Sequence, residues 1–318
     1  MNAPTSSTLT PPPHAGRAKR VGFLLGIGAY ASWGVLPIYF KLVGSIPPVT
    51  IVAQRLVWSF VVLLLLVTLT RGWPAIRTAL AHRRTLAILA VTSALIAINW
   101  LLYVYAVNNG HILAGSLGYY LNPIANILLG RFLLKEHLSR LQWAAVAIAG
   151  AGIAVLAAGA LGQLWISLLL CASFASYGFI RKVIGTDALS GLAIETAILL
   201  PFALGWLLLA HNPGAPLLSP SASVSALLVL SGVLTTAPLL MFTLAARRLP
   251  YSTIGMLQFI APTTQLLLAV FLYDEPFTRA HAIAFAAIWT ALALYIIGLI
   301  GAARRERLAS AADDAMMR

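Results

Sequence analysis

The sequence predicts an all-α membrane protein, with ten transmembrane helices that form two inverted repeats of five helices each. Three observations lead to this fold class. The composition is 60% hydrophobic and only 9% charged. Ten apolar runs are long enough to cross a bilayer, which takes about 20 residues of helix. The two halves of the chain share a pattern of residues at a spacing of about 140 positions.

The composition excludes most soluble classes of protein. Soluble domains carry about 25% charged residues, and a soluble fold of this composition would expose large apolar patches. The formal net charge of +13 does not predict nucleic-acid binding, because the basic residues lie between apolar runs and do not gather on one face. The single cysteine, Cys171, lies within an apolar run and predicts neither a disulfide nor a metal site. No cofactor is expected.

The expected spans follow one another with short connections. Polar residues 1–19, with a run of three prolines, are expected to be disordered. The first repeat is expected at 20–160 and the second at 162–301, and the polar tail 302–318 is expected to fray. The first run is too long for a signal-peptide core, so it is expected to remain as a membrane helix. The ten spans are predicted at 20–43, 49–70, 86–107, 111–134, 141–160, 162–182, 190–210, 222–246, 252–273 and 279–301.

The basic residues predict the orientation. With the N-terminus in the cytoplasm, 18 of the 21 Lys and Arg residues flank the inner ends of the spans. Lys41 and Arg279 flank the outer ends, and Arg55 lies within a span. This bias is the one that the positive-inside rule describes, so both termini are expected in the cytoplasm and the protein in the inner (plasma) membrane. An odd number of helices in each half makes the two repeats cross the membrane in opposite directions.

The internal repeat is clearest around two prolines. YYLNPIANILLGRFLLKEHL at 119–138 aligns with QFIAPTTQLLLAVFLYDEPF at 258–277, at a shift of 139 residues. The shift places Pro123 over Pro262. Proline removes a backbone donor and kinks a helix. Matched interruptions in two halves of a transporter indicate a binding site near the bilayer midplane.

Four segments carry a resemblance to a known family. They are NWLLYVYAVNNGHILAGSLGYYLNPIANILLG at 99–130, ASYGFIRK at 175–182, IETAILLP at 194–201 and STIGMLQFIAPTTQLLLAVFLYDE at 252–275. The chain resembles the RarD group of the EamA family, in the drug/metabolite transporter superfamily. This resemblance implies a ten-helix inner-membrane permease built from two EamA repeats, and it supplies no substrate. Ala114 stands where the family is expected to have an acidic residue, so no role of that acid is carried over.

Charged groups inside the spans are costly and tend to face a cavity. Glu195 is the one carboxylate expected within a span, and Arg55 matches it in the first repeat at a shift of 140. Their expected depths differ by roughly 13 Å, so we expect no direct ion pair, and each is predicted to serve one mouth of a pathway. The alternative is that both extend to the nearest interface. Glu195 is either the carrier of protons as coupling ion or a structural partner of Arg181 or Lys182.

The other candidate binding residues flank the two prolines or lie in the first and third spans. A cavity between the halves is predicted around Asn122 and Gln265. The alternative interpretation is that these groups only help helices to pack. The remaining candidates are Trp33, Asn99, Tyr103, Tyr119, Asn126, Gln258 and Thr263.

The predicted function is secondary-active transport of a small polar or amphipathic metabolite or drug by alternating access. The sequence has no phosphate loop, zinc-protease motif or nucleophile elbow, so an enzyme is not expected. A membrane-embedded enzyme, or a receptor or sensor without transport, is the alternative. The expected partners are a small-molecule substrate and the lipid bilayer. Small residues at 22–26 and 144–162 favour close helix contact, either within the chain or in a homodimer.

Overall fold

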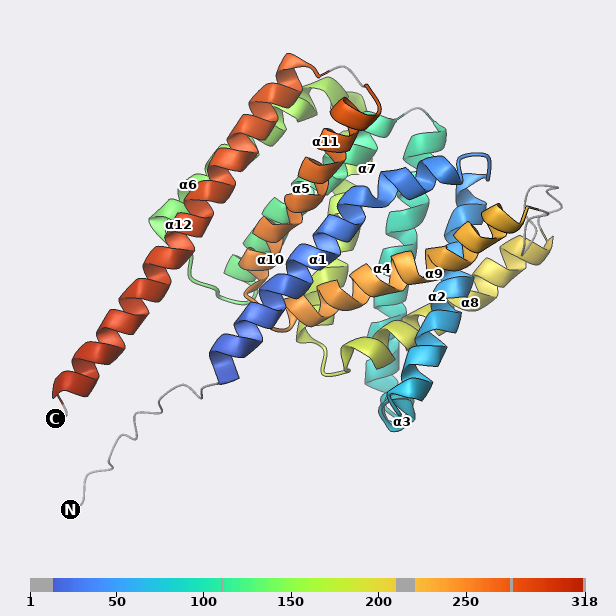
Figure 1. The fold of residues 1–318 in the computed structure, drawn as a ribbon, viewed down its shortest axis with the longest axis horizontal. Coiled ribbons are helices and arrows are strands. Elements are labelled where there is room, and N and C mark those ends of the chain that lie inside the picture. Colours follow the sequence, from blue (N-terminus) through green and yellow to red (C-terminus); the bar gives the residue numbers. More distant parts are fainter. Residues whose placement is uncertain (1–13, 110, 210–220, 275–276, 317–318) are drawn as a thin grey trace.

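The computed structural model describes residues 14–109, 111–209, 221–274 and 277–316. These residues are helical apart from short connections, and none of them forms a strand. Nine helical stretches in the described ranges are long and apolar enough to cross a membrane. Helix α5 (Ile112–Phe132), with 21 residues, occupies the place of the remaining predicted span. The predicted all-α membrane fold is confirmed (Figure 1).

The first half of the chain contains one helix that the sequence did not predict. Helix α3 has nine residues, too few to span, and contacts α4 and α8 at one end of the molecule. The helices of this half are α1 (His14–Leu42), α2 (Pro48–Leu69), α3 (Trp73–Ala81), α4 (Arg83–Asn108), α5 (Ile112–Phe132) and α6 (Arg140–Ala157), followed by the 3-10 helix η1 (Ala158–Gln163).

The second half contains an interrupted span. Helices α10 and α11 form one span that is broken at Phe259, because Pro262 has no N–H to donate to the carbonyl of Gln258. By contrast, α5 remains continuous through Pro123. The helices of this half are α7 (Leu164–Val183), α8 (Ala188–Leu209), α9 (Ala222–Ala246), α10 (Tyr251–Gln258), α11 (Ile260–Leu272) and α12 (Arg279–Met316).

Both ends of the described chain are more helical than predicted. Helix α12 continues to Met316, so the expectation that the tail beyond 301 frays is wrong. Residues 302–316 are rich in Ala and Arg, which favour helix, and they extend the last span without a break. Helix α1 begins at His14, within the stretch 1–19 that was expected to be disordered. Residues 1–13 lie outside the described ranges.

The helix contacts follow a two-fold relation between the halves. Matching the repeats pairs α1 with α7, α2 with α8, α4 with α9, α5 with α10–α11, and α6 with α12. Three contacts join such partners: α2 with α8, α5 with α10, and α6 with α12. Other contacts occur in matched pairs: α4·α7 with α1·α9, α2·α9 with α4·α8, and α5·α7 with α1·α11. Lys135 and Asp274, at matching positions after α5 and α11, both have positive φ, 56° and 52°.

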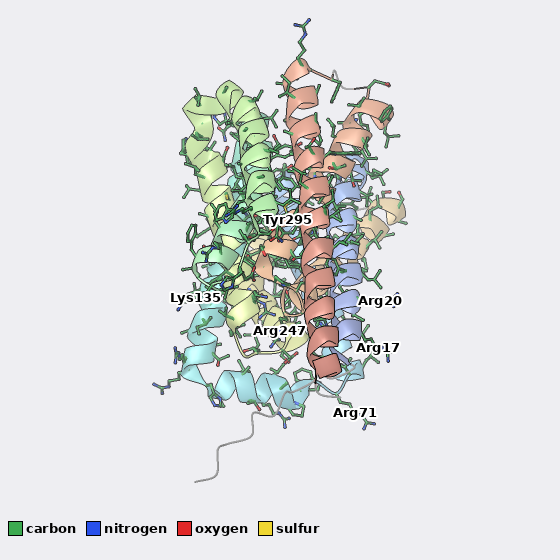
Figure 2. All side chains as sticks on the ribbon, turned by 90° about the vertical axis from the view of Figure 1, so that its left-hand side faces the viewer. Arg17, Arg20, Arg71, Lys135, Arg247 and Tyr295 are labelled. Atoms are coloured by element: carbon green, nitrogen blue, oxygen red, sulfur yellow. The ribbon has the colours of Figure 1, made fainter. Side chains whose placement is uncertain are left out.

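One end of the molecule carries many of the basic side chains. Figure 2 places Arg17, Arg20, Arg71, Lys135 and Arg247 in the lower half of the view. We call this end the basic end. Helix α1 begins there, since it carries the first two of these arginines near its start. Its partner α7 ends there, because its last turn contacts the end of α9. The matched helices α1 and α7 therefore run in opposite directions, as an inverted repeat requires.

Small residues allow close contacts between the repeats. A Cβ on Gly22 would lie 2.9 Å from the Cβ of Arg248, and one on Gly26 would lie 2.8 Å from Leu257. A Cβ on Gly152 would lie 2.6 Å from Ala287 of α12. All three distances are shorter than real Cβ contacts. These glycines therefore serve packing within the chain.

Candidate functional site

Arg55 of α2 lies in an aromatic environment between the two repeats. Its Nε donates a hydrogen bond of 2.8 Å to Thr235 Oγ1 of α9. The guanidinium carbon lies 5.4 Å from the ring centre of Phe40 and 5.5 Å from that of Trp100. Both distances permit attraction between the cation and the ring. We call Arg55, Phe40, Trp100 and Thr235 the Arg55 site.

The Arg55 site contains no acidic partner. Among the described residues, the only ion pair joins Arg181 and Glu195. The groups that interact electrostatically with Arg55 are the phenols of Tyr39, Tyr103 and Tyr119. Arg55 is only half-buried, so part of this site is open. The sequence prediction that Arg55 and Glu195 form no direct pair agrees with this geometry.

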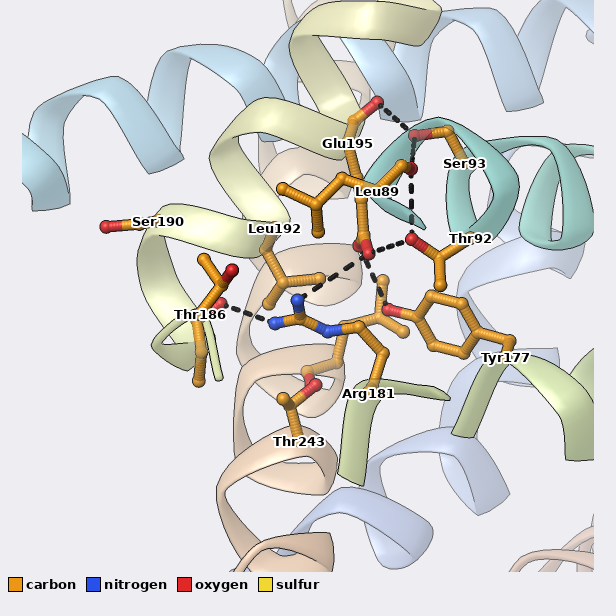
Figure 3. Close-up of polar contacts among 12 residues, drawn as sticks. Leu89, Thr92, Ser93, Tyr177, Arg181, Thr186, Ser190, Leu192, Glu195 and Thr243 are labelled. Atoms are coloured by element: carbon orange, nitrogen blue, oxygen red, sulfur yellow. Dashed lines mark hydrogen bonds and ion pairs between the residues drawn. The ribbon is translucent and has the colours of Figure 1, made fainter. Parts of the chain in front are cut away.

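Glu195 of α8 is buried in a polar network near the basic end. One carboxylate oxygen accepts a hydrogen bond of 2.6 Å from Thr92 Oγ1 of α4, and the other accepts one of 3.3 Å from the Tyr177 hydroxyl of α7. Arg181 Nη1 lies 3.7 Å from Oε1 (Figure 3). We call these four residues the Glu195 network. The side chain faces no open mouth here, contrary to the prediction for Glu195, because three helices enclose it.

Arg181 fits into this network because its neighbour is glycine. A Cβ on Gly191 would overlap Nη1 of Arg181. Nη2 donates a hydrogen bond of 3.0 Å to the carbonyl of Ala188, in the first turn of α8. The side chain of Arg181 is fully buried. Arg181 therefore joins α7 to α8 through one carbonyl and one carboxylate.

A small cavity lies between the Arg55 site and the helix of Glu195. Its volume is about 20 Å³, and its lining includes Trp100, Thr235, Leu192 and Thr196. This volume holds about one water molecule. A larger cavity of about 350 Å³ between α2, α3 and α8 is lined by aliphatic and aromatic side chains, so it offers little to a polar ligand. Most of the surface of the small cavity is apolar, and neither Arg55 nor Glu195 lines it, so it separates the two charged regions.

The predicted amide groups mostly bridge helices. Asn126 Nδ2 donates to Gln258 Oε1 at 2.7 Å, which joins α5 to α10. Gln265 Nε2 donates to the carbonyl of Trp33 at 3.2 Å, which joins α11 to α1. Asn99 Nδ2 donates to the carbonyl of Leu170 and to Ser173 on α7. These contacts agree with the packing interpretation for Asn126, Gln265 and Asn99.

Asn122 differs from the other amides. Its side chain is fully buried, and neither its oxygen nor its nitrogen has a hydrogen-bond partner among the residues that the structure describes. A buried amide without partners is unfavourable, so it requires a reason other than packing. Neither of the two cavities described above is lined by Asn122 or Gln265. Tyr103, Tyr119 and Thr263 are half-buried.

A cluster of aromatic side chains fills the middle of the molecule. Trp33 packs edge-on against Tyr30 and Phe174, with ring centres 5.5 and 5.8 Å apart. Phe242 of α9 packs against the same three rings. Tyr30 and Phe242 are fully buried, whereas Trp33 is half-buried. This cluster joins α1, α7 and α9 across the two repeats.

Sequence reasoning missed two polar contacts at the basic end, of which one joins the two repeats and the other joins two helices of the second repeat. The carboxylate of Glu136, after α5, accepts hydrogen bonds from the backbone N–H groups of Tyr251 and Ser252 and from Ser252 Oγ. It thereby caps the start of α10. Lys182 Nζ donates to the carbonyls of Ala246 and Leu249 at the end of α9, at 2.7 and 2.6 Å. The sequence contained a signal for these contacts, because Glu136 and Lys182 both lie at positions that match between the two repeats.

Inverted repeats with polar groups between them are typical of membrane transporters. The sequence profile of the EamA-like transporter family matches residues 20–158. An uncharacterized transporter of Pseudomonas aeruginosa is 47% identical over 280 residues, which cover 87% of this chain and 93% of the relative. Protein RarD of Escherichia coli K12 is 41% identical over 294 residues, 90% of this chain and 97% of RarD. This chain belongs to the RarD group of the EamA family.

A solved structure shares this fold at low sequence identity. It is described as a crystal structure of a protein, superposes with a TM-score of 0.68 and is 19% identical. The match covers 88% of this chain and 98% of the other. At this identity the likeness supports the fold alone.

Proposed function

We propose that this protein is a secondary-active transporter, which moves a small polar or amphipathic metabolite or drug across the inner membrane by alternating access. The main support is the placement of two polar regions, the Arg55 site and the Glu195 network, with the small cavity between the Arg55 site and the helix of Glu195. These groups come from both repeats and lie between them. Polar groups placed between inverted repeats are typical of secondary transporters. By the positive-inside rule, the basic end and both termini face the cytoplasm.

The structure supports a state in which the pathway is closed at the basic end. Glu136 joins the two repeats there, Lys182 joins α7 to the end of α9, and Tyr177 and Tyr251 are fully buried close by. At the other side of the central cluster, Arg55 is half-buried. Substrate in this state would reach Arg55 from the end opposite the basic end. Opening of the basic end by separation of the repeats requires the contacts of Glu136 to break.

Protons are the proposed coupling ion, and Glu195 is the proposed carrier. A carboxylate that is enclosed in one state and reached by water in another can bind and release a proton during the cycle. The ion pair with Arg181 supports a second role, in which Glu195 stabilises the contact of α7 with α8. The Glu195→Gln variant separates these roles, because it keeps the shape of the side chain and cannot release a proton.

Transport is tested first by comparing metabolites inside and outside cells that lack or overproduce the protein. Solutes that change are then loaded into proteoliposomes, and their flux is measured at two external pH values. With Glu195→Gln, a coupling role predicts normal protein amounts and loss of the pH-driven accumulation. A structural role predicts less protein and unchanged, pH-dependent transport per molecule. Absence of solute flux through the unaltered protein would contradict the proposed function.

A further inference from the structure

We propose that the substrate is an aromatic or similarly flat monocarboxylate, and that Arg55 binds its carboxylate group. This inference rests on the proposed function and specifies its substrate class. It depends on the charge balance of the Arg55 site, on the free donors of the guanidinium and on the rings around it.

Arg55 carries a positive charge inside the membrane without a protein counter-ion. Among the described residues, no carboxylate oxygen lies within 4.0 Å of a nitrogen of the Arg55 guanidinium. The one ion pair within these residues joins Arg181 and Glu195. A charge at this depth is costly unless it is paired or serves a ligand. The neutral phenols of Tyr103 and Tyr119 are its electrostatic neighbours from α4 and α5. An anionic ligand would supply the missing charge.

The guanidinium is held in place and still has donors to offer. Thr235 accepts the Nε hydrogen bond and is the only hydrogen-bond partner of Arg55 among the described residues. The two terminal nitrogens therefore keep their N–H groups. These groups match the two oxygens of a carboxylate in a bidentate arrangement. A single guanidinium balances one negative charge, so a monocarboxylate fits better than a doubly charged phosphate ester.

The surroundings favour a flat apolar group on the same molecule. Phe40 and Trp100 flank the guanidinium, while Tyr103 and Tyr119 pack edge-on with ring centres 5.4 Å apart. Trp33 is half-buried in the central cluster. Aromatic walls with few polar groups are common in sites for amphipathic small molecules. An inorganic anion would leave these walls without a partner.

The space beyond Arg55 is too small for the ligand to bind deeper in the molecule in this state. The cavity next to Arg55 holds only about 20 Å³, which excludes an organic molecule. On its other side lies the helix of Glu195, whose ion pair with Arg181 leaves no net positive charge for an anion. The carboxylate of the ligand would therefore stop at Arg55, with its flat group among the rings.

The test uses purified full-length protein and three probes of similar shape: phenylacetate, neutral phenylacetamide and cationic phenethylammonium. Binding is measured as a concentration-dependent rise of the thermal unfolding midpoint. The variants are Arg55→Gln, Arg55→Lys and Arg279→Gln, the last being an exposed arginine at the start of α12. Arg55→Lys keeps the charge and loses the fork of donors. Size-exclusion profiles establish that each variant is folded.

Phenylacetate should stabilise the unaltered protein and Arg279→Gln alike. Arg55→Gln should weaken its binding by about 10- to 100-fold, the usual effect of losing a charged hydrogen bond, and Arg55→Lys should lie between. Equal binding of phenylacetamide, unchanged binding by Arg55→Gln, or no binding of phenylacetate to the unaltered protein would overturn the inference. Solute flux in the metabolite experiment without phenylacetate binding refutes only this inference. Binding without flux of any solute refutes the proposed function.

Discussion

Arg55 and Glu195 occupy matching positions of the two repeats, yet their surroundings are opposite. Glu195 is almost fully buried, and both of its oxygens accept hydrogen bonds in addition to the ion pair with Arg181. Arg55 is half-buried, and within the described part of the chain it has one hydrogen bond and otherwise faces neutral phenols and rings. The same scaffold position thus carries an internally balanced charge in one repeat and an unbalanced charge in the other.

This difference indicates how the repeats divide their roles in this state. At the basic end, Glu136 binds the start of α10 in the other repeat, and Lys182 binds carbonyls at the end of α9 in its own repeat. Lys41 matches Lys182 in the first repeat, but its Nζ lies over the ring of Tyr273, 3.6 Å from the centre. The two ends of the molecule therefore have a related backbone structure but different polar contacts. We infer that alternating access exchanges such contacts between the two ends.

The largest expected effect is that of removing the partner of Glu195. Arg181→Met leaves a buried carboxylate without its cation, which costs about 3–5 kcal/mol of folding free energy. Arg55→Met removes a charge that has no partner and should cost far less. The measurement is unfolding in mixed micelles as the denaturing detergent is increased. A substantial loss for Arg181→Met and a small one for Arg55→Met would support the contrast.

A double variant provides the control for this comparison. Arg181→Met combined with Glu195→Met removes both charges, and such replacements are often close to neutral. The double variant should therefore regain most of the stability that Arg181→Met loses. If Arg181→Met alone unfolds like the unaltered protein, Glu195 is not held by this pair, and the comparison with Arg55 fails.

A smaller effect is expected from the cap of α10. Glu136→Ala removes three hydrogen bonds at the start of this helix, two of them from backbone N–H groups. Hydrogen bonds to charged groups contribute about 1.5–3 kcal/mol each when isolated, and water replaces part of this at a half-buried site, so we expect a loss of about 1–3 kcal/mol. Hydrogen exchange should speed up at Tyr251 and Ser252.

The neighbouring His137 supplies a matched control for Glu136. His137 is exposed, so His137→Ala should leave exchange at the start of α10 unchanged. Equal exchange rates in Glu136→Ala and the unaltered protein would show that the cap does not hold the basic end closed. The inner contacts would then be no stronger than those at the opposite end.

The sequence predicts the fold well because its signals act along the chain. Apolar length, the distribution of basic residues and the repeat predict the all-α membrane fold without any knowledge of helix faces. The matched positions also single out Arg55 and Glu195. The partner of Glu195 is harder to predict, because Arg181 lies fourteen residues away across the turn between α7 and α8.

The features that the sequence missed depend on three-dimensional packing. Helix α3 is too short to register as a span, although its contacts with α4 and α8 stabilise it. Glu136 looks like an ordinary loop residue until the start of α10 is placed beside it. Similarly, Asn122 and Asn126 look alike in sequence, and only packing separates the amide that is bonded from the one that is not.

The smallest expected effect on stability comes from this pair of amides. Asn126→Leu removes the hydrogen bond to Gln258, and such bonds between membrane helices contribute about 0.6 kcal/mol on average and up to about 2. Asn122→Leu removes two polar atoms that have no partner, so folding should be unchanged or slightly more stable. The unfolding of both variants is compared in mixed micelles. If Asn122 is kept for transport, Asn122→Leu should fold normally and lose solute flux in proteoliposomes. Clear destabilisation by Asn122→Leu would instead assign this residue, like Arg181, to the balanced interior of the protein.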